Sequence, residues 1–519
     1  MVPLATRSPI LVRWLLVLAE IGLVFVVFAL YGAWPVPDVN EVHYLGKAVH
    51  FWNPEWAKGD FFLDSTDAHW VFYYGFGWLS LWLSPVALAW TGRVATWWLL
   101  AWSWRRLSWA ALPRRWWSVA TAAIALLLID RFQMAGEWMV GGVEAKGFAY
   151  VLVLLGLECL LRDRWNRTWL CFGGASMIHV IVGGWAVVAA GLAWFLLGPD
   201  RRPTLRSMTP GLLGGFAISL PGLIPALLLG WGVDASVASR ANEIYVFARL
   251  PHHLNPARFP AHVLLRFAAM LFVWALVRWK TSEKQPVWRL HCFVAGSIAL
   301  CMAGIVICHA LAGQPDRAAA LLRFYWFRLS DIAVPIGLAL GTPVLIEQLR
   351  PLRPSLARAA GVLFAVLALG FVGWNAGELV AGREIRVMPA ERIGFADWRD
   401  ACRWIASSGE IPDDAVFLTP RLSRTFKWYA NRAEVVNWKD IPQDAASIVE
   451  WWDRNGWVHA TGSEDADRRW FDSLAEQGEY RLVLLGRHYK ASYVLTVTEP
   501  RLNLPVVYEN NSFIVYQLE

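Results

Sequence analysis

The stretch WPVPDVNEVHYLGKAVHFWNPEWAKGDFF, residues 34–62, follows the first long apolar segment of the chain and combines acidic residues, histidines and lysines. A charged side chain costs about 2.5–3.5 kcal/mol at the centre of a membrane span, so charges beside a span usually serve a site. Residues 41–52 show the spacing of an amphipathic helix with Glu41 at its start. We therefore expect a helix that lies on the bilayer and presents Glu41 to a site at the membrane surface.

The composition supports this membrane setting. Of 519 residues, 57% are hydrophobic and only 17% are charged, and the 34 tryptophans are a large excess. Tryptophan gathers where membrane meets water, because its ring is apolar while its N–H needs a polar partner. These values exclude an ordinary soluble enzyme and indicate a polytopic membrane protein. The net charge of +7 lies mainly in loops beside apolar segments, so we expect no nucleic-acid partner.

Eleven apolar stretches have the length of a membrane span or come close to it. They lie at about residues 10–33, 91–104, 116–130, 147–161, 168–180, 182–197, 211–231, 262–279, 291–311, 329–347 and 356–380. Alternate connections are rich in lysine and arginine, which the positive-inside rule assigns to the cytoplasm. The N-terminus is then cytoplasmic, and the odd number of spans puts the tail outside. Counting residues 69–90 as a further span would break this alternation, so we expect an interfacial helix there.

The pattern divides the chain into two domains. Residues 1–381 form a transmembrane domain whose first external loop is 34–90, and residues 382–519 form a C-terminal extracytoplasmic α/β domain. In this second domain the pattern predicts strands at 414–420, 433–438, 480–486 and 492–498, a hairpin at 505–518, and helices at 397–409, 443–455 and 464–477. The expected fold is thus an α-helical polytopic bundle of about eleven spans with a small external domain.

The segment PDVNEVHYL, residues 37–45, resembles the start of the first external loop in the GT-C superfamily of glycosyltransferases, where an acidic residue follows the first span. That superfamily includes protein O-mannosyltransferases and lipid A aminoarabinose transferases. A second acid, Glu144 in WMVGGVEAKGFAY (138–150), matches the acidic residue that members often carry in the second external loop. The resemblance implies transfer of a sugar from a polyprenyl-phosphate donor to an acceptor outside, with inversion at the anomeric carbon.

The resemblance also implies roles for individual residues. Glu41 would take the acceptor proton or hold a divalent cation, Mg or Mn, together with Asp38, and Glu144 would be a further catalytic acid. Cations would bind the donor phosphate, preferably arginines. The expected substrate-binding residues are Tyr44, Lys146, His179, Arg249, His252, His253, Arg323 and Arg328. The plainer alternatives are interfacial snorkelling for the two last arginines, an ordered Pro-rich loop for 245–260, and a hydrogen-bonded helix-turn histidine for His179.

Two other functions stay open at this point. A transporter or flippase of lipid-linked saccharides would explain many spans with polar residues, but it predicts repeated halves, and the sequence contains none. A non-catalytic membrane scaffold with a glycan-binding external domain predicts that loss of Glu41 changes nothing. The absence of eukaryotic targeting signals favours a bacterial inner membrane. The sugar and the acceptor are not readable from the sequence.

Overall fold

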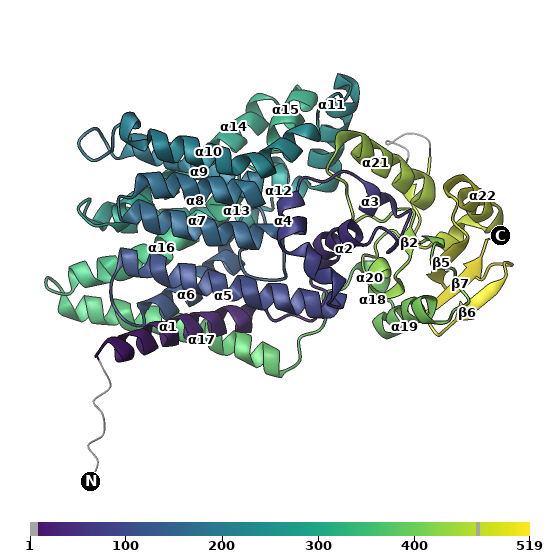
Figure 1. The fold of residues 1–519 in the computed structure, drawn as a ribbon, viewed down its shortest axis with the longest axis horizontal. Coiled ribbons are helices and arrows are strands. Elements are labelled where there is room, and N and C mark those ends of the chain that lie inside the picture. The colour runs from purple at the N-terminus through teal and green to yellow at the C-terminus, as the bar shows by residue number, and fades with distance from the viewer. Residues whose placement is uncertain (1–8, 463–467, 519) are drawn as a thin grey trace, which may run out of the picture.

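The computed structural model describes residues 9–462 and 468–518 and is mostly helical. Each of the eleven apolar stretches falls largely within one helix. These helices are α1 (Pro9–Gly32), α5 (Pro85–Ala111), α6 (Trp117–Phe132), α7 (Ala145–Leu161), α8 (Trp165–Ile178), α9 (Val180–Leu196), α10 (Leu205–Leu228), α13 (Ala261–Lys280), α14 (Val287–Ala310), α16 (Arg328–Leu349) and α17 (Pro354–Val380). They lie side by side as one bundle (Figure 1).

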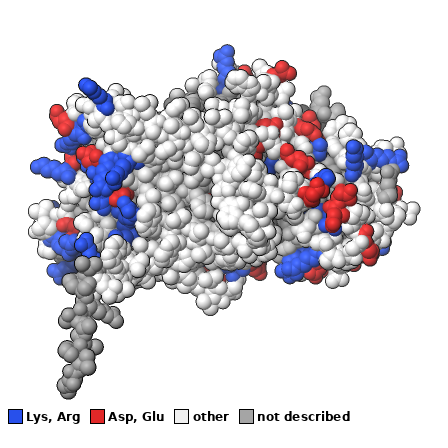
Figure 2. All heavy atoms as spheres, viewed as in Figure 1, with Lys and Arg blue, Asp and Glu red and all other residues white. Residues whose placement is uncertain are grey.

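Six helices of the described chain are long and apolar enough to cross a membrane by themselves, namely α1, α10, α13, α14, α16 and α17. The other five are shorter or less apolar, so the number of spans stays a prediction. Figure 2 shows charged side chains gathered at the two ends of this face, with a nearly uncharged band between them. Such a band is expected where a surface faces lipid tails.

Glycines allow α8 and α10 to pack closely. A Cβ at Gly173 of α8 would collide with the carbonyl group of Gly215 in α10, and a Cβ at Gly222 would collide with the backbone of Met177. Small residues at such points let helix backbones approach one another where the hydrophobic effect between helices is absent. The α8–α10 pair is therefore a firmly packed wall of the bundle.

The first loop contains α2 (Glu41–Trp52), α3 (Phe61–Asp64), α4 (Trp70–Gly75) and the 3₁₀ turn η1 (Gly77–Leu81). The predicted helix at 41–52 is present, but its expected place on the bilayer is wrong. The helix packs on α5 and η1 on one side and on α20 (Phe426–Ala430) on the other, and most of its residues are buried. Protein therefore covers both of its faces (Figure 1). The segment 69–90 is not one interfacial helix. It contains α4 and η1, and its last residues already belong to α5, which begins after its N-cap residue Ser84.

The other connections on this side also contain short helical elements. They contain α11 (Ala235–Glu243), the π-helical turn η2 (Ile244–Arg249), α12 (Pro251–Leu254), η3 (Pro256–Arg258) and α15 (Pro315–Leu322). α11 packs on α15 and also on α21 (Ala445–His459) of the C-terminal part. The connections thus contact the region that follows the last long helix.

The C-terminal part contains a five-stranded mixed sheet in the order β2-β1-β5-β7-β6. β1 (Val416–Leu418) pairs in parallel with β2 (Ala433–Glu434) and β5 (Tyr493–Val497), while β7 (Phe513–Gln517) pairs antiparallel with β5 and β6 (Val506–Glu509). The remaining elements are α18 (Pro389–Arg392), α19 (Phe395–Ser407), β3 (Ala460–Thr461), β4 (Arg469–Trp470), η4 (Leu474–Gln477) and α22 (Glu479–Tyr489).

Three predictions for this part need correction. Residues 480–486 are helical, because Leu482 and Leu485, three residues apart, bury one face of α22. Only the first two residues of 433–438 form a strand. Residues 464–477 are not one helix: 463–467 lie outside the described residues, and the rest forms β4 and a 3₁₀ turn.

A buried lysine joins the C-terminal part to the first loop. The Lys427 ammonium of α20 lies 2.8 Å from Asp440, 3.0 Å from Glu434 and 3.2 Å from Asp60, which caps α3. The Glu434 amide also donates to Asp60. Burial of a charge is costly unless it is paired, so this cluster fixes the position of one part on the other.

Candidate functional site

Glu41 lies at the start of α2 and is completely buried. The Arg93 guanidinium of α5 donates to both of its oxygens, with Nε–Oε1 and Nη2–Oε2 distances of 2.6 Å. Two backbone amides also donate to the carboxylate, from Val143 at 2.9 Å and from Asp38 at 2.7 Å. Four donors therefore occupy this carboxylate, and Arg93 is buried with it.

The same contacts connect two loops. The Asp38 amide belongs to the entry into α2, while Val143 immediately precedes Glu144 in the segment between α6 and α7. Gly142 packs directly on the Glu41 side chain, where an added Cβ would lie 2.9 Å from Cγ. Glu41 thus holds the backbone beside the other two carboxylates expected from the sequence.

The Asp38 carboxylate is buried at the edge of this arrangement. Its Oδ1 accepts from the Val39 amide at 2.8 Å and lies 3.6 Å from the Arg386 guanidinium. Arg386 follows α17 and stacks on Trp34, which precedes α2, at 3.7 Å. Asp38 therefore lies where the first loop meets the start of the C-terminal part.

Glu144 takes part in a bridge between three segments. The Asn40 amide donates to its Oε1 at 2.7 Å, and the Lys439 ammonium donates to the Asn40 oxygen, also at 2.7 Å. Burial raises the pKa of Glu144 above its ordinary value, and burial lowers the pKa of Lys439 to about 8. A carboxyl with a raised pKa is a better proton acceptor near neutral pH.

Lys146 flanks Glu144 on its other side, and Arg328 pairs with the neighbouring Glu137. The Lys146 ammonium lies 3.5 Å from Glu144 and 3.6 Å from Glu137, over the ring of Trp138. Arg328, at the start of α16, pairs with Glu137 at 2.5 Å and stacks on Tyr325. The second loop thus gathers carboxylates and cations in one buried place.

An aromatic group closes the cluster toward the bundle. Tyr44 of α2 contacts His69, and the His69 ring lies 5.2 Å away by its centroid. The Nδ1 atom of His69 lies 2.9 Å from the Asp67 carboxylate and 3.0 Å from the amide nitrogen of Gln443. The centroid of the His69 ring lies 5.4 Å from that of His179. His179 occupies the turn between α8 and α9. The expected residues Tyr44 and His179 are therefore part of one connected set.

The remaining expected residues lie at the rim. Arg249 donates to the carbonyls of Trp438 and Lys439, so it holds the C-terminal part. His253 contacts the Ala135 carbonyl at 2.5 Å, and His252 stacks on His253 toward solvent. Arg323 donates to Asn242 of α11. The structure therefore gives Arg249 and Arg323 protein partners.

An apolar hollow lies near His179. Its volume is about 320 Å³, and α8, α9 and α10 line it with mostly apolar side chains. Ser176 and Val180 lie at its wall, on either side of the turn that contains His179. The hollow therefore lies beside the turn that contains His179.

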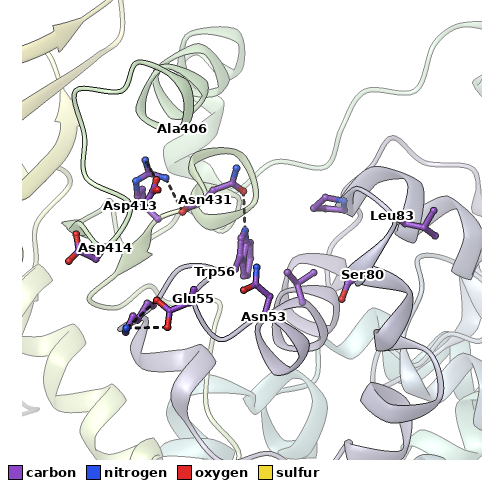
Figure 3. Close-up of a pocket in the computed structure, with 13 residues that line it drawn as sticks. Asn53, Glu55, Trp56, Ser80, Leu83, Ala406, Asp413, Asp414 and Asn431 are labelled. Atoms are coloured by element: carbon purple, nitrogen blue, oxygen red, sulfur yellow. Dashed lines mark hydrogen bonds and ion pairs between the residues drawn. The ribbon is translucent and has the colours of Figure 1, made fainter.

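A larger cleft of about 610 Å³ separates the first loop from α19 and α20 (Figure 3). Trp56 reaches across it and donates to Asn431. Val49, near the other end of α2, lines this cleft, two helical turns away from Glu41. The cleft thus lies apart from the buried cluster and contains none of the groups discussed above.

The expected cation site does not fit the geometry. Arg93 and two amides already occupy the Glu41 carboxylate, and no group of three His, Cys, Asp or Glu side chains in the described part of the chain is arranged to hold a metal ion. Lysines and arginines lie beside the other carboxylates instead.

Several important residues were missed by the sequence analysis. Arg93 is a lone arginine among apolar residues of an expected span, and that signal predicts a buried acidic partner. Glu137 and Lys439 carry no such signal, because their partners come from distant segments.

The fold and site define a helical bundle with candidate membrane spans, a polar cluster at one end and an α/β part covering it. Residues 396–458 match a family described as a domain of unknown function, DUF6798. No curated protein matches the chain.

The chain has structural neighbours among solved structures of the oligosaccharyltransferase from Archaeoglobus fulgidus. Three of these structures, described next, are each 11% identical in sequence to this chain. One is tethered to an acceptor peptide containing an NVT sequon (TM-score 0.45, 93% of this chain, 69% of that chain). A second is in complex with zinc and sulfate (TM-score 0.46, 92% of this chain, 67% of that chain). A third, AglB, is in complex with an inhibitory peptide and a dolichol-phosphate (TM-score 0.43, 92% of this chain, 69% of that chain).

Proposed function

We propose that the protein is a membrane glycosyltransferase, which transfers a sugar from a polyprenyl-phosphate donor to an acceptor on the side of the C-terminal part. One observation carries the proposal. Carboxylates and cations are buried together at one end of an apolar helical bundle, and an apolar hollow among α8, α9 and α10 reaches the residues on either side of His179. Such a place suits a ligand with a charged head and an apolar tail.

The chemistry is a single displacement. The acceptor oxygen forms a bond to the anomeric carbon, the bond from that carbon to the phosphate oxygen breaks, and the polyprenyl phosphate leaves with the electron pair. Asp38 or Glu144 takes the acceptor proton. Because attack occurs opposite the leaving group, the reaction inverts the anomeric centre.

The cations have the matching role. Lys146 and Lys439 lie near Glu144, and Arg328 pairs with the neighbouring Glu137. We assign these three cations to the donor phosphate, whose negative charge grows as the sugar bond breaks. Tyr44 and His179 border the same space from the bundle side. Glu41 positions the two reactive carboxylates through the backbone of both loops.

The membrane orientation is part of the proposal. The C-terminal part would lie in the extracytoplasmic space of a bacterial inner membrane, with the N-terminus in the cytoplasm. Arginine-rich connections at the opposite end of the bundle support this orientation, because such residues are retained on the cytoplasmic side.

The proposal is tested with the full chain in liposomes. Each member of a panel of radiolabelled polyprenyl-phosphate sugars is supplied with membrane extract as the source of acceptor. We expect label to leave the lipid fraction with one donor, and the product to form only with the protein present. Label that crosses the bilayer but stays on the lipid would instead indicate a flippase. No movement of label with any donor would support a scaffold.

A further inference from the structure

A second polar hollow lies at the end of the bundle farthest from the C-terminal part. Its volume is about 580 Å³, and it is formed by α1, α5 with the residues that follow it, and the connection between α7 and α8. Six arginines line it: Arg13, Arg105, Arg106, Arg115, Arg162 and Arg164. Figure 2 shows basic side chains gathered at this end of the molecule.

Two buried carboxylates organise some of these arginines. Glu20 of α1 pairs with Arg105 at 2.9 Å and accepts from the Trp109 ring and the Trp116 amide. Glu158 of α7 pairs with Arg106 and Arg162. These pairs fix guanidinium groups at the wall of the hollow.

Positive charge nevertheless exceeds negative charge in the hollow. Arg13, Arg115 and Arg164 form no ion pair with a residue of the described chain, and they are exposed. The Nε of Arg106 is buried and has no hydrogen-bond acceptor among the described residues. The hollow therefore has unused donors for an anion with several oxygens.

The remaining wall is apolar. Val12, Leu16 and Val17 of α1 line the same hollow. The exposed side of α1 carries further large apolar residues, including Leu15 and Leu18, as expected of a helix that faces lipid tails. A ligand here would meet guanidinium groups at its head and an apolar helix beside its tail.

We propose that this hollow binds the phosphate headgroup of an anionic phospholipid from the leaflet opposite the C-terminal part. Basic pockets between membrane helices are known to take such headgroups. The lipid would join α1, α5 and the α7–α8 connection at a point where the protein itself supplies excess positive charge. This site is separate from the proposed transfer site and does not depend on that function.

The test uses the full chain in detergent, with phosphatidylglycerol, phosphatidylcholine and inorganic phosphate as probes. Native mass spectrometry measures bound lipid, and thermal unfolding measures stabilisation. We expect the wild type to bind phosphatidylglycerol at least ten-fold more tightly than phosphatidylcholine. Equal binding of the two lipids would overturn the proposal, as would equal stabilisation by inorganic phosphate, because the lipid tail would then contribute nothing.

A double variant, Arg115→Gln with Arg164→Gln, locates the site. Both side chains are exposed and hold no carboxylate of the described chain, so their loss leaves no buried charge unpaired. We expect the preference for phosphatidylglycerol to fall at least ten-fold. The matched control is Arg353→Gln with Arg358→Gln, two exposed arginines at the α16–α17 end of the bundle that do not line the hollow. An unchanged preference in the first variant, or an equal loss in the control, would contradict the assignment.

Discussion

The Arg93 guanidinium contacts both oxygens of the Glu41 carboxylate at 2.6 Å, and neither side chain is exposed. The pair joins a helix of the bundle to the first loop. Because the same carboxylate also accepts from the amides of Asp38 and Val143, it sets the distance between the two loops that carry the proposed reactive acids.

This pair predicts a stability effect. A catalytic Glu41 would give a Glu41→Gln protein that is inactive but as stable as the wild type. The observed geometry instead leaves Arg93 buried with an uncharged partner, which costs about 3–5 kcal/mol. We expect a lower unfolding temperature in detergent and less folded protein on size-exclusion chromatography.

A double-mutant cycle checks the coupling between the two residues. Glu41→Gln with Arg93→Met removes both charges, so its destabilisation should be smaller than the sum of the two single variants. Additive losses would mean that the two side chains do not stabilise each other.

Lys427 predicts how firmly the C-terminal part is attached. Lys427→Met would leave Asp60, Glu434 and Asp440 buried without their cation, at a cost of about 3–5 kcal/mol. We expect faster proteolytic release of residues 382–519 from the full chain. Lys58→Met is the control, because Lys58 is exposed and pairs only with the exposed Glu55. Surface pairs of this kind contribute about 0–1 kcal/mol. Equal release from both variants would contradict the docking role.

Lys439 predicts a pH dependence of donor binding. Burial lowers its pKa to about 8, so its charge is present below pH 8 and is lost above it. Donor phosphate should therefore bind more weakly as the pH rises through 8, and Lys439→Gln should remove this part of the dependence. Binding is measured as the Kd for a polyprenyl phosphate on both sides of pH 8. A wild-type Kd that does not change there would exclude Lys439 from the phosphate site.

The lowered pKa of Lys439 affects folding stability in the opposite direction to donor binding as the pH rises. The folded state binds fewer protons than the unfolded state between pH 8 and the ordinary lysine value of 10.5. This group therefore favours folding increasingly as the pH rises through that window. Weaker donor binding above pH 8 cannot then be ascribed to unfolding caused by Lys439.

The local sequence pattern predicted the helices and strands of this fold better than it predicted the contacts between them. Long apolar runs predicted the helices, and the pattern at 505–518 predicted the β6–β7 hairpin, because both depend on neighbouring residues. The pattern predicted a strand where α22 forms, because a short apolar run fits both the helical and the strand periodicity. Only the packing of α22 in the folded protein decides between the two.

The candidate site was only partly predictable for the same reason. Asp38, Glu41 and Glu144 stand out as acids near apolar segments, and the structure brings them together. The contact between Asn40 and Lys439 joins residues far apart in the chain, and no local pattern encodes it. The ion pair of Glu41 with Arg93 was likewise not predictable. It forms only because α5 packs on α2.

The initial rate of sugar transfer by Asp38→Asn and Glu144→Gln proteins in liposomes tests the central claim most directly. Removing the proton acceptor should lower the rate by about 10²–10⁴-fold in at least one of them, with unfolding temperatures near that of the wild type. Asp400→Asn, at an exposed site on α19, should keep the wild-type rate. Wild-type rates in both test variants would contradict the proposal that this buried cluster performs the transfer.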